Sequence, residues 1–571
     1  MTFPSVHRYH DGTKHHFNNF ARSLGYLDWS SQPRPFRTFA GTKAFPLYPT
    51  PSVSAGGYTP RSTTYAQLFD GDGVVEQVSA AAIGDVLRHA LGLSAWKRFE
   101  KSRWSLRVNP SSGNLHPTEA YIVCGAVAGL SGTPAVYHYA ADRHSLELRC
   151  AVDAPAWMSA CAGREDILLI ALTSIHWREA WKYGERAFRY CQHDLGHAMA
   201  AVGVSAALAG WRTRLLPAWS HRSIATLSGI DRDEDFIEAE REEPACLLAV
   251  SATDVPAALN RDGHALVEAV RNGRWSGRAS QLSENHVEWT FIDEIARETE
   301  DPGHPVVFET LARNTGPAFV SQSAVSPRLV DCSPPQGEPG EARGYRAGQL
   351  DAHAIILRRR SAVAFDGQSA IDGLVFFDML SRIVPGRHAP WDVLWWTPRI
   401  HLVLFVHRVD GVAPGLYLLA RDPQALDRLQ ASCGREFLWE PAHDTVPVMC
   451  LARGDCRMLA KRLSCDQDIA ADGFFSLGMI ADFDASLGAH GRSFYRHLFW
   501  ESGVVGQALY LEAEAAGTRS TGIGCFYDDP VHDVLGLQGH AFQSLYHFTV
   551  GMPVDDTRLT TEPGYGWEAK S

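Results

Sequence analysis

The sequence lacks several features that would point to common classes of protein. None of its 11 cysteines forms a Cys-x-x-Cys pair, so neither a zinc ribbon nor a disulfide framework is readable. No run approaches the ~18 apolar residues of a membrane span, and residues 1–16 lack the apolar core of a signal peptide. The net charge of −12 argues against a basic face for nucleic acid or membranes. We therefore expect a cytoplasmic protein with reduced thiols and no nucleic-acid or membrane partner.

An internal repeat is the main feature that is present. "GERAFRYCQHDLGHAMAAVGVSAALAG" (184–210) and "GRSFYRHLFWESGVVGQALYLEAEAAG" (491–517) align without a gap at an offset of 307 residues. The alignment places Gly196 on Gly503. Each segment predicts a long helix that is apolar on most sides and ends at a glycine, which is typical of a helix inside a structure. Two such helices predict two halves packed together along them.

Shorter patterns predict the class and organisation of the fold. Helices are expected over 81–94 and 372–385, and β-rich runs occur in both halves. Strands and helices mix without regular βαβ alternation, which predicts an α+β fold. A Pro/Gly-rich stretch, 333–344, is the expected linker. The predicted units are an irregular N-terminal extension, a first domain, a helical arm with the linker, a second domain and a tail: residues 1–60, 61–255, 256–348, 349–560 and 561–571.

The second half carries two motifs suited to an anionic, planar ligand. "LRRRSAVAF" (357–365) contains three arginines, and "STGIGCFYDD" (520–529) contains a Gly-x-Gly turn. Arginine makes forked, charge-assisted contacts to phosphate, and glycines let the backbone approach a flat ligand. Each motif alone is a weak signal, because arginines are usually exposed and Gly-x-Gly is usually a plain turn.

The first half lacks those motifs but keeps a different one. "PRSTTY" (60–65) and "RLLPAW" (214–219) stand in the corresponding places, with one arginine in the first and no glycine in the second. In contrast, "NPSSGN" (109–114) offers N–H groups, hydroxyls and an amide for the polar edge of a heteroaromatic ring, although it could be an ordinary turn. The second half has the bulky "LWWTPRIHLVLF" (394–405) there. This complementarity predicts one cofactor site between the halves and a lost mirror-related site.

These residues resemble the FMN-dependent nitroreductase superfamily, whose flavin lies at a dimer interface. More narrowly, "RVNPSSGNLHPTEAY" (107–121) followed by "WKYGERAFRY" (181–190) resembles the SagB-type dehydrogenases, which include the azoline oxidases of thiazole- and oxazole-containing peptide pathways. The resemblance covers roughly 60–255 and 350–560. It implies two nitroreductase-like domains in tandem, each an antiparallel sheet flanked by helices, forming an intramolecular pseudo-dimer with one FMN at the seam.

The resemblance also implies a set of residues that hold FMN. They form a loop against the flavin ring, a clamp for the phosphate, a turn against the ring and one further basic residue. In that order, they are Arg107, Pro110, Ser111, Ser112 and Asn114; Arg358, Arg359, Arg360 and Ser361; Gly522, Ile523 and Gly524; and Arg558. The Arg-Arg-Ser motif of the clamp can be aligned from either the first or the second of the three arginines. The chain departs from the family at Val363, where a basic residue is frequent.

Lys182 and Tyr183 match a Lys-Tyr pair that azoline oxidases use near the flavin. Oxidation of a carbon–heteroatom ring requires a proton to leave as hydride passes to the flavin. Either side chain would need burial or a charged neighbour to act as the base near neutral pH. A structural role at the start of a helix is the alternative. The repeat places Ala489 and His490 there in the second half, so one copy alone could act in this way.

Several other polar residues are interpreted as structural. Asp194 and His197 on the first long helix are expected to support the interface between the halves. Cys525 is interpreted as a small packed residue rather than a redox thiol. No metal site is predicted, because the N-terminal histidines are loosely spaced: His7, His10, His15 and His16.

The expected function is FMN-dependent oxidoreduction, with hydride transfer between the substrate and the flavin. The favoured reaction is dehydrogenation of a heterocycle or C–N bond in a small-molecule or peptide-like metabolite, with proteins of a biosynthetic pathway as candidate partners. Two alternatives stay open. One is an NAD(P)H-dependent nitro- or quinone reductase, and the other is a degenerate flavin-fold scaffold protein without activity.

Overall fold

The computed structural model describes six stretches of the chain, and the predicted linker at 333–344 lies outside them. They are residues 3–47, 62–70, 75–256, 259–261, 263–304 and 350–568.

The first half is built around an antiparallel sheet whose central strands are buried on both faces. β5 (Thr118–Cys124) and β8 (Ile167–Ser174) are largely apolar, and every residue in both is buried. Ile122 enters one hydrophobic core while Val123 enters another. The strand order is β11, β7, β6, β5, β8, β10 and β9, with β2 also paired to β7. The other bounds are β2 Ala44–Pro46, β6 Ala135–Ala140, β7 Ser145–Ala151, β9 Arg212–Leu215, β10 Glu243–Ser251 and β11 Arg274–Trp275.

The second half repeats this strand order. Its sheet runs β17, β18, β16, β14, β19, β21 and β20, and all these pairs are antiparallel. Six strands therefore correspond one to one with β7, β6, β5, β8, β10 and β9, which confirms the predicted α+β fold with two similar domains. The bounds are β14 Ile400–Val406, β16 Gly415–Leu419, β17 Glu440–Pro441, β18 Val448–Arg453, β19 Phe475–Asp482, β20 Arg519–Ile523 and β21 Phe542–Gly551.

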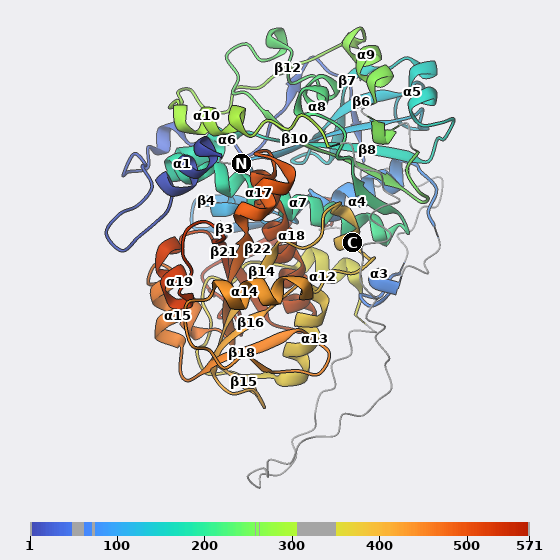
Figure 1. The fold of residues 1–571 in the computed structure, drawn as a ribbon. Coiled ribbons are helices and arrows are strands. Elements are labelled where there is room, and N and C mark those ends of the chain that lie inside the picture. The colour runs from blue at the N-terminus through green and yellow to red at the C-terminus, as the bar shows by residue number, and fades with distance from the viewer. Residues whose placement is uncertain are drawn as a thin grey trace.

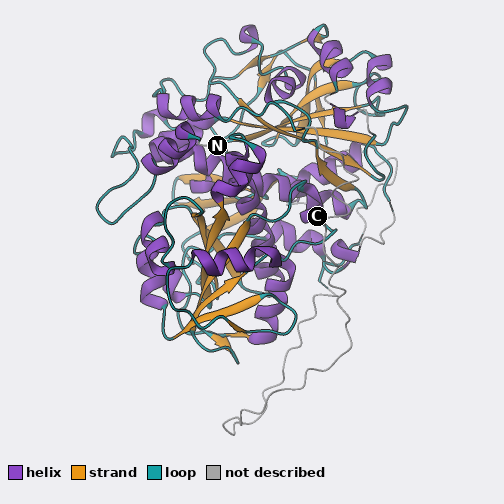
Figure 2. Cartoon of the chain, viewed as in Figure 1, coloured by secondary structure: helices purple, strands orange, loops and turns teal. Residues whose placement is uncertain are grey.

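Helices surround both sheets (Figure 2). The helices predicted at 81–94 and 372–385 are present as α4 (Ala80–Ala90) and α13 (Gly373–Ile383). The other helices are α3 Gln67–Asp70, α5 Ala154–Ala160, α6 His176–Tyr183, α8 His221–Ser228, α9 His264–Arg271, α10 Thr290–Glu298, α12 Ala352–Arg358, α14 Leu426–Ser432, α15 Arg457–Leu463, α16 Ile469–Asp472, α17 Phe483–His490 and α19 Asp528–Leu535. The short strands are β1 Phe39–Ala40, β12 Arg278–Ala279, β13 Ile371–Asp372 and β15 Val409–Asp410.

The two predicted long helices pack against each other in the middle of the molecule (Figure 1). α7 (Ala187–Leu208) and α18 (Phe494–Ala515) each have 22 residues and are almost entirely buried. They cross at Gly196 and Gly503. A Cβ added to Gly196 would lie 2.1 Å from the backbone oxygen of Trp500 and 2.9 Å from the Cα of Gly503. Only residues without a side chain allow the two backbones to approach this closely.

Each end of the described chain packs against the opposite half. α1 (Pro4–Gly12) contacts the second half, where His10 Nε2 lies 3.0 Å from Gln543 Oε1 in β21. β22 (Thr560–Pro563) pairs with β3 (Leu93–Phe99) of the first half, which pairs in turn with β4 (Ser102–Arg107). The N-terminal segment is therefore partly helical rather than irregular throughout, and the predicted tail begins inside a strand.

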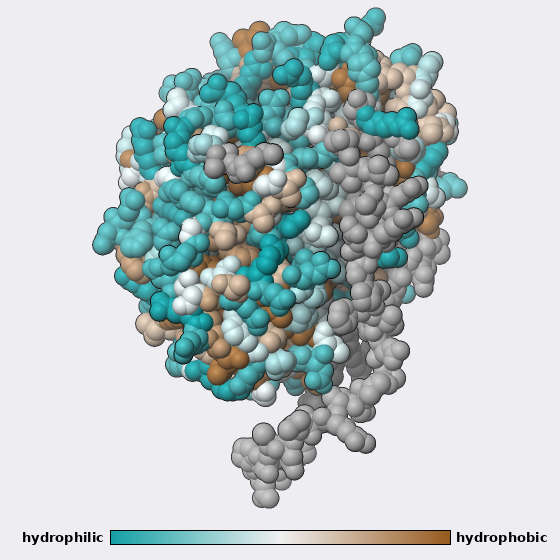
Figure 3. Space-filling view, viewed as in Figure 1, coloured by the Kyte–Doolittle hydropathy of each residue, from teal (hydrophilic) through white to brown (hydrophobic). Residues whose placement is uncertain are grey.

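The surface in Figure 3 is mostly hydrophilic, with scattered hydrophobic residues. Among the described helices, none combines the length and hydropathy needed to cross a membrane.

Gly196→Ala should destabilise the protein strongly. The new methyl group would collide with backbone atoms of α18, so the free energy of unfolding should fall by about 3 kcal/mol or more. Gly488→Ala is the matched control, because a Cβ there meets no described atom within 4 Å. Urea unfolding of both variants measures the difference. Equal stabilities would contradict the close helix crossing.

Candidate functional site

A cavity of about 710 Å³ lies between the two halves. The first half contributes the loop at 109–114, and the second half contributes residues 359–363 and 521–525. The structure thus brings together twelve of the residues singled out in the sequence: Arg107, Pro110, Ser111, Ser112, Asn114, Tyr183, Arg359, Arg360, Ser361, Gly522, Ile523 and Gly524.

Three of the fifteen residues that the resemblance assigned to catalysis or FMN binding do not line this cavity. The Arg358 side chain is 62% exposed and lies 3.8 Å from a carboxylate oxygen of Glu514. Arg558 is exposed and pairs with Asp556 at 2.7 Å. Lys182 is also exposed, but its Nζ lies beside the loop, 3.2 Å from the position that a Cβ on Gly113 would take.

Two arginines, one buried and one partly buried, form the basic wall of the cavity. α12 ends at Arg358, and the chain then turns inward, so that Arg359 is only 4% exposed. Arg359 Nε and Nη2 donate to the carbonyls of Val108 and Arg107, each at 3.2 Å, which joins the two halves. Arg360 Nη2 donates to Ser94 O at 3.0 Å.

This wall carries unsatisfied positive charge. Among the described residues, Arg359 Nη1 has no hydrogen-bond partner. Burial, together with the neighbouring Arg359, lowers the pKa of Arg360 to about 9. A buried cation with a free donor is costly unless an anion or another acceptor is nearby. The wall is therefore suited to a phosphate or carboxylate group.

The loop opposite this wall is held by the first long helix. The Asp194 carboxylate accepts hydrogen bonds from Ser112 N at 3.0 Å and Ser112 Oγ at 3.1 Å. Asn114 Nδ2 donates to Ser105 O at 2.9 Å, and Gly113 and Asn114 both adopt positive φ angles. The tight bend explains the small and amide residues in this run, because they tolerate the left-handed region best. Asp194 has the structural role that the sequence suggested.

A second carboxyl group under the loop was missed by the sequence analysis. Glu179 Oε1 accepts from Ser111 Oγ at 3.4 Å. Burial and the nearby Asp194 raise the pKa of Glu179, and burial raises the pKa of Asp194 to about 7. Two neighbouring buried carboxyl groups resist losing both of their protons, because each charge disfavours the other. No spacing rule links residues on two separate helices, so the sequence held no signal for this pair.

The predicted Gly-x-Gly turn is the end of a strand instead, because Gly522 and Ile523 lie in β20 and Gly524 directly follows it. These glycines make room for tyrosines that line the cavity. A Cβ on Gly524 would lie 2.4 Å from the Tyr190 ring, and one on Gly522 would lie 2.0 Å from Tyr546 Oη. Tyr190 Oη donates to Gly524 O at 3.1 Å, so α7 also fixes the turn that follows β20. Residues of both halves therefore form this side of the cavity.

Tyr183 is placed as a neutral hydroxyl at the cavity. Its ring contacts that of Tyr190 edge-on at 4.6 Å, and a Cβ on Gly113 would lie 2.5 Å from its Oη. Burial and then Glu179 raise the pKa of Tyr183 well above its usual range. This environment favours a hydrogen-bond donor over a base. Of the Lys-Tyr pair, the exposed Lys182 is the better placed to exchange protons with water.

The mirror-related carboxyl group, Glu501, has different surroundings. It aligns with Asp194 in the repeat. Instead of holding a loop at a cavity, Glu501 accepts from Trp396 Nε1 at 2.8 Å and from the Arg399 N–H at 3.0 Å. It also pairs with the buried Arg421. Protein groups therefore satisfy this carboxylate completely.

Trp395 occupies the place where the mirror-related loop would lie. Its ring centroid is 5.4 Å from that of His490 and 6.0 Å from that of His497. These two histidines align with Tyr183 and Tyr190, which border the cavity in the first half. The tryptophan is 5% exposed. The two sides of the molecule are thus similar in backbone but different in side chains.

Comparison with known proteins identifies the fold. Residues 415–552 match the model of the nitroreductase family. A solved structure from Anabaena variabilis, described as a candidate nitroreductase, has a TM-score of 0.65 and 21% identity, covering 96% of this chain and 99% of that chain. The chain therefore has a nitroreductase fold throughout, and residues 415–552 are similar in sequence to that family. This confirms the superfamily resemblance at the level of the fold.

Two further similarities have TM-scores too low to support an argument. A microcin synthetase complex from E. coli matches with 17% identity over 35% of this chain and 73% of that chain, with a TM-score of 0.25. A candidate nitroreductase from Ralstonia eutropha matches with 14% identity over 41% of this chain and 98% of that chain, with a TM-score of 0.26. None of the curated proteins compared with the sequence matches it.

Asp194→Asn should become less harmful to stability as pH rises from about 4 to about 7. In this window the unfolded chain releases the Asp194 proton, while burial keeps it bound in the folded protein. The wild type therefore loses up to about 1.4 kcal/mol of unfolding free energy per pH unit from this group, and the variant does not. Urea unfolding at several pH values measures the difference, with the exposed Asp444→Asn as control. A pH-independent difference would contradict the prediction.

Proposed function

We propose that this chain is an FMN-dependent oxidoreductase of the SagB type that binds one flavin in the cavity between its halves. The proposed reaction is dehydrogenation of a heterocycle or C–N bond in a peptide-like metabolite in the cytoplasm. The main support for this proposal is the buried Arg359, whose Nη1 lacks a hydrogen-bond partner among the described residues. Arg359 lines the same cavity as the loop at 109–114 of the other half. Neither half forms this cavity alone.

The residues present fit the two ends of FMN. Arg359, Arg360 and Ser361 offer two cations and a hydroxyl for the phosphate. The loop at 109–114 and the turn at 522–524 line the same cavity from opposite halves, with polar groups on one side and backbone on the other. This combination suits a ring system with a polar edge and flat faces.

The chain's own groups position the substrate and move its proton. When bound, FMN supplies the hydride acceptor. Tyr183 Oη offers a hydrogen bond beside Gly113, and Lys182 Nζ lies next to it at the solvent side. Lys182 is proposed to bind the substrate at the solvent side of the cavity and to direct the proton that leaves it toward water. Asp194 holds the loop through Ser112 and so fixes the distance between these groups and the cavity.

The purified protein should show flavin absorbance with a ratio near one FMN per chain. Arg359→Ala should weaken FMN binding by about tenfold to a hundredfold, because one charged hydrogen-bonding group is lost. Arg358→Ala is the matched control, since this neighbouring arginine is 62% exposed and outside the cavity. Titration of the flavin-free protein with FMN measures both affinities.

Other results of this titration would favour the alternatives. A ratio near two would contradict the single site, and a colourless protein that binds no FMN would favour a scaffold. Equal losses in both arginine variants would remove Arg359 from the site. Rapid anaerobic reduction of the flavin by NADPH or NADH, without oxidation of a thiazoline-containing peptide, would favour a nitro- or quinone reductase.

Lys182→Met should slow substrate oxidation by about a hundredfold while leaving the flavin content unchanged. The variant removes the charge that is proposed to direct the proton, whereas the arginines and the glycines that line the cavity stay in place. Anaerobic flavin reduction by a thiazoline-containing peptide, followed by stopped-flow absorbance, gives the rate directly. Lys101→Met, at the exposed turn between β3 and β4, is the control. An unchanged rate in Lys182→Met would exclude this role.

A further inference from the structure

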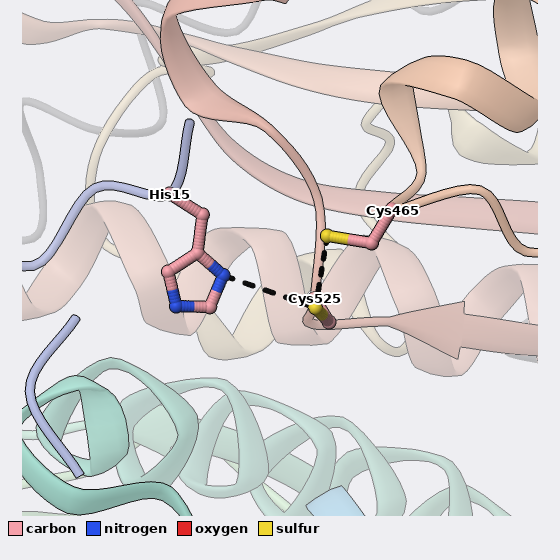
Figure 4. A group of neighbouring side chains, drawn as sticks. All are labelled: His15, Cys465 and Cys525. Atoms are coloured by element: carbon pink, nitrogen blue, oxygen red, sulfur yellow. Dashed lines mark hydrogen bonds between the residues drawn. The ribbon is translucent and has the colours of Figure 1, made fainter. Parts of the chain in front are cut away.

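Two cysteines from separate loops meet at the wall of the cavity (Figure 4). Cys525 Sγ lies 2.9 Å from Cys465 Sγ and 3.8 Å from His15 Nδ1. Cys525 directly follows the glycine turn and lines the cavity, whereas Cys465 follows α15. Cys525 was expected to be a small packed residue, because two cysteines 60 positions apart in the sequence give no sign of this contact.

These two thiols differ from the other described cysteines in exposure. Cys465 and Cys525 are partly exposed, while the eight others within the described ranges are buried. Cys332 lies outside those ranges. Buried thiols in apolar surroundings are inert, whereas thiols that solvent can reach are open to chemistry. The pair is therefore the accessible thiol site of the described chain.

The backbone around Cys465 is bent toward its partner. Cys465 has φ 55° and Asp466 has φ 57°, a left-handed conformation that non-glycine residues seldom adopt. Gln467 secures the bend, because its Nε2 donates to Ser464 O at 2.8 Å and to Cys525 O at 3.0 Å. The strained loop is thus tied to the segment that carries the second cysteine.

The N-terminal segment completes the group of side chains. His15 N–H donates to the Asp528 carboxylate at 2.8 Å, and Asp528 N–H donates to His15 O at 3.0 Å. Arg186 pairs with Asp528 at 2.9 Å and donates to Gly524 O at 3.3 Å. An imidazole and a guanidinium therefore lie beside Cys525.

This setting separates the two thiols chemically. Hydrogen bonds from Cys465 and His15, with the nearby Arg186, outweigh burial and lower the pKa of Cys525 to about 5. The same contact with Cys525, then burial, raises the pKa of Cys465. These shifts favour a thiolate on Cys525 beside a thiol on Cys465. A thiolate is the nucleophile in disulfide exchange, and an adjacent thiol resolves the mixed disulfide.

The sulfur positions favour a dithiol over a metal site. The cluster has three candidate ligands, His15, Cys465 and Cys525. Two thiolates on a tetrahedral zinc ion, each about 2.3 Å from the metal, would lie about 3.8 Å apart. The observed 2.9 Å is much shorter and leaves no room for an ion between the sulfurs.

We propose that Cys465 and Cys525 form a redox-active dithiol that exchanges with low-molecular-weight disulfides such as glutathione disulfide. The Cys525 thiolate attacks one sulfur of the disulfide, whose S–S bond breaks and releases one thiolate. Cys465 then attacks Cys525 Sγ, the mixed S–S bond breaks, and the second small thiol leaves with the Cys465 proton. The protein pair loses two electrons, and the small disulfide gains them. This inference does not depend on the proposed flavin.

Mass spectrometry of the full-length protein tests this site directly. The protein is equilibrated in glutathione buffers of graded GSSG:GSH ratio, quenched with acid, blocked with N-ethylmaleimide and digested with trypsin. The two cysteines fall in separate tryptic peptides, 463–492 and 520–558, neither of which contains another cysteine. The expected result is a linked pair of these peptides that appears as the ratio rises and disappears with dithiothreitol. The eight buried cysteines should stay unlinked.

Single variants assign the roles of the two cysteines. In Cys465→Ser, glutathione should accumulate on Cys525, because the resolving thiol is gone. In Cys525→Ser, the yield of glutathione adduct on Cys465 should be at least about tenfold lower, because the activated thiolate is missing. Circular dichroism confirms that each variant is folded.

Three outcomes would overturn the proposal. The first is the absence of the linked peptides at every ratio in the folded wild type. The second is equal glutathione adducts on both cysteines in the variants. The third is one equivalent of zinc per chain that protects both thiols until a chelator removes it, which would assign a metal site instead.

Discussion

The close approach of α7 and α18 at Gly196 and Gly503 is the constraint on which the rest of the structure depends. With no side chain at either position, two backbones touch and the halves reach a fixed distance from each other. At that distance, side chains from α7 and the residue before it reach the second half: Tyr190 contacts Gly524, and Arg186 contacts Asp528. A wider separation would open the cavity to solvent and remove the partners that keep these polar groups satisfied.

Because of this arrangement, each half contributes a different wall of the cavity. α7 holds the loop at 109–114 through Asp194, while the segment after α12 places Arg359 against the carbonyls of the first half. The two ends of the described chain stabilise the interface between the halves. α1 contacts the second half, and β22 extends a sheet of the first half. The cavity is therefore a property of the complete chain, and each wall is fixed by contacts from the other half.

Much of the fold could be predicted from the sequence because it is encoded in local periodicity and in the repeat. The offset of 307 residues gave both long helices, and the motifs around Ser112, Arg359 and Gly522 proved to be neighbours. The distinction between the exposed Arg358 and the buried Arg359 could not be predicted, since it depends on where α12 ends. The contact of Cys465 with Cys525 and the carboxyl group of Glu179 beneath the loop join segments without a shared pattern. Such encounters arise only from tertiary packing.

Covalent fusion of the two halves changes what substitution can achieve. In an assembly of two identical subunits, any replacement appears twice, so a bulky residue that blocks one pocket blocks its twin as well. Here Trp395 fills one side while Gly113 keeps the other open. Being joined in a single polypeptide frees the blocked side from selection for binding, and its surface can drift toward other tasks, such as rigid support. Because one gene encodes both halves, every molecule contains one open and one blocked side.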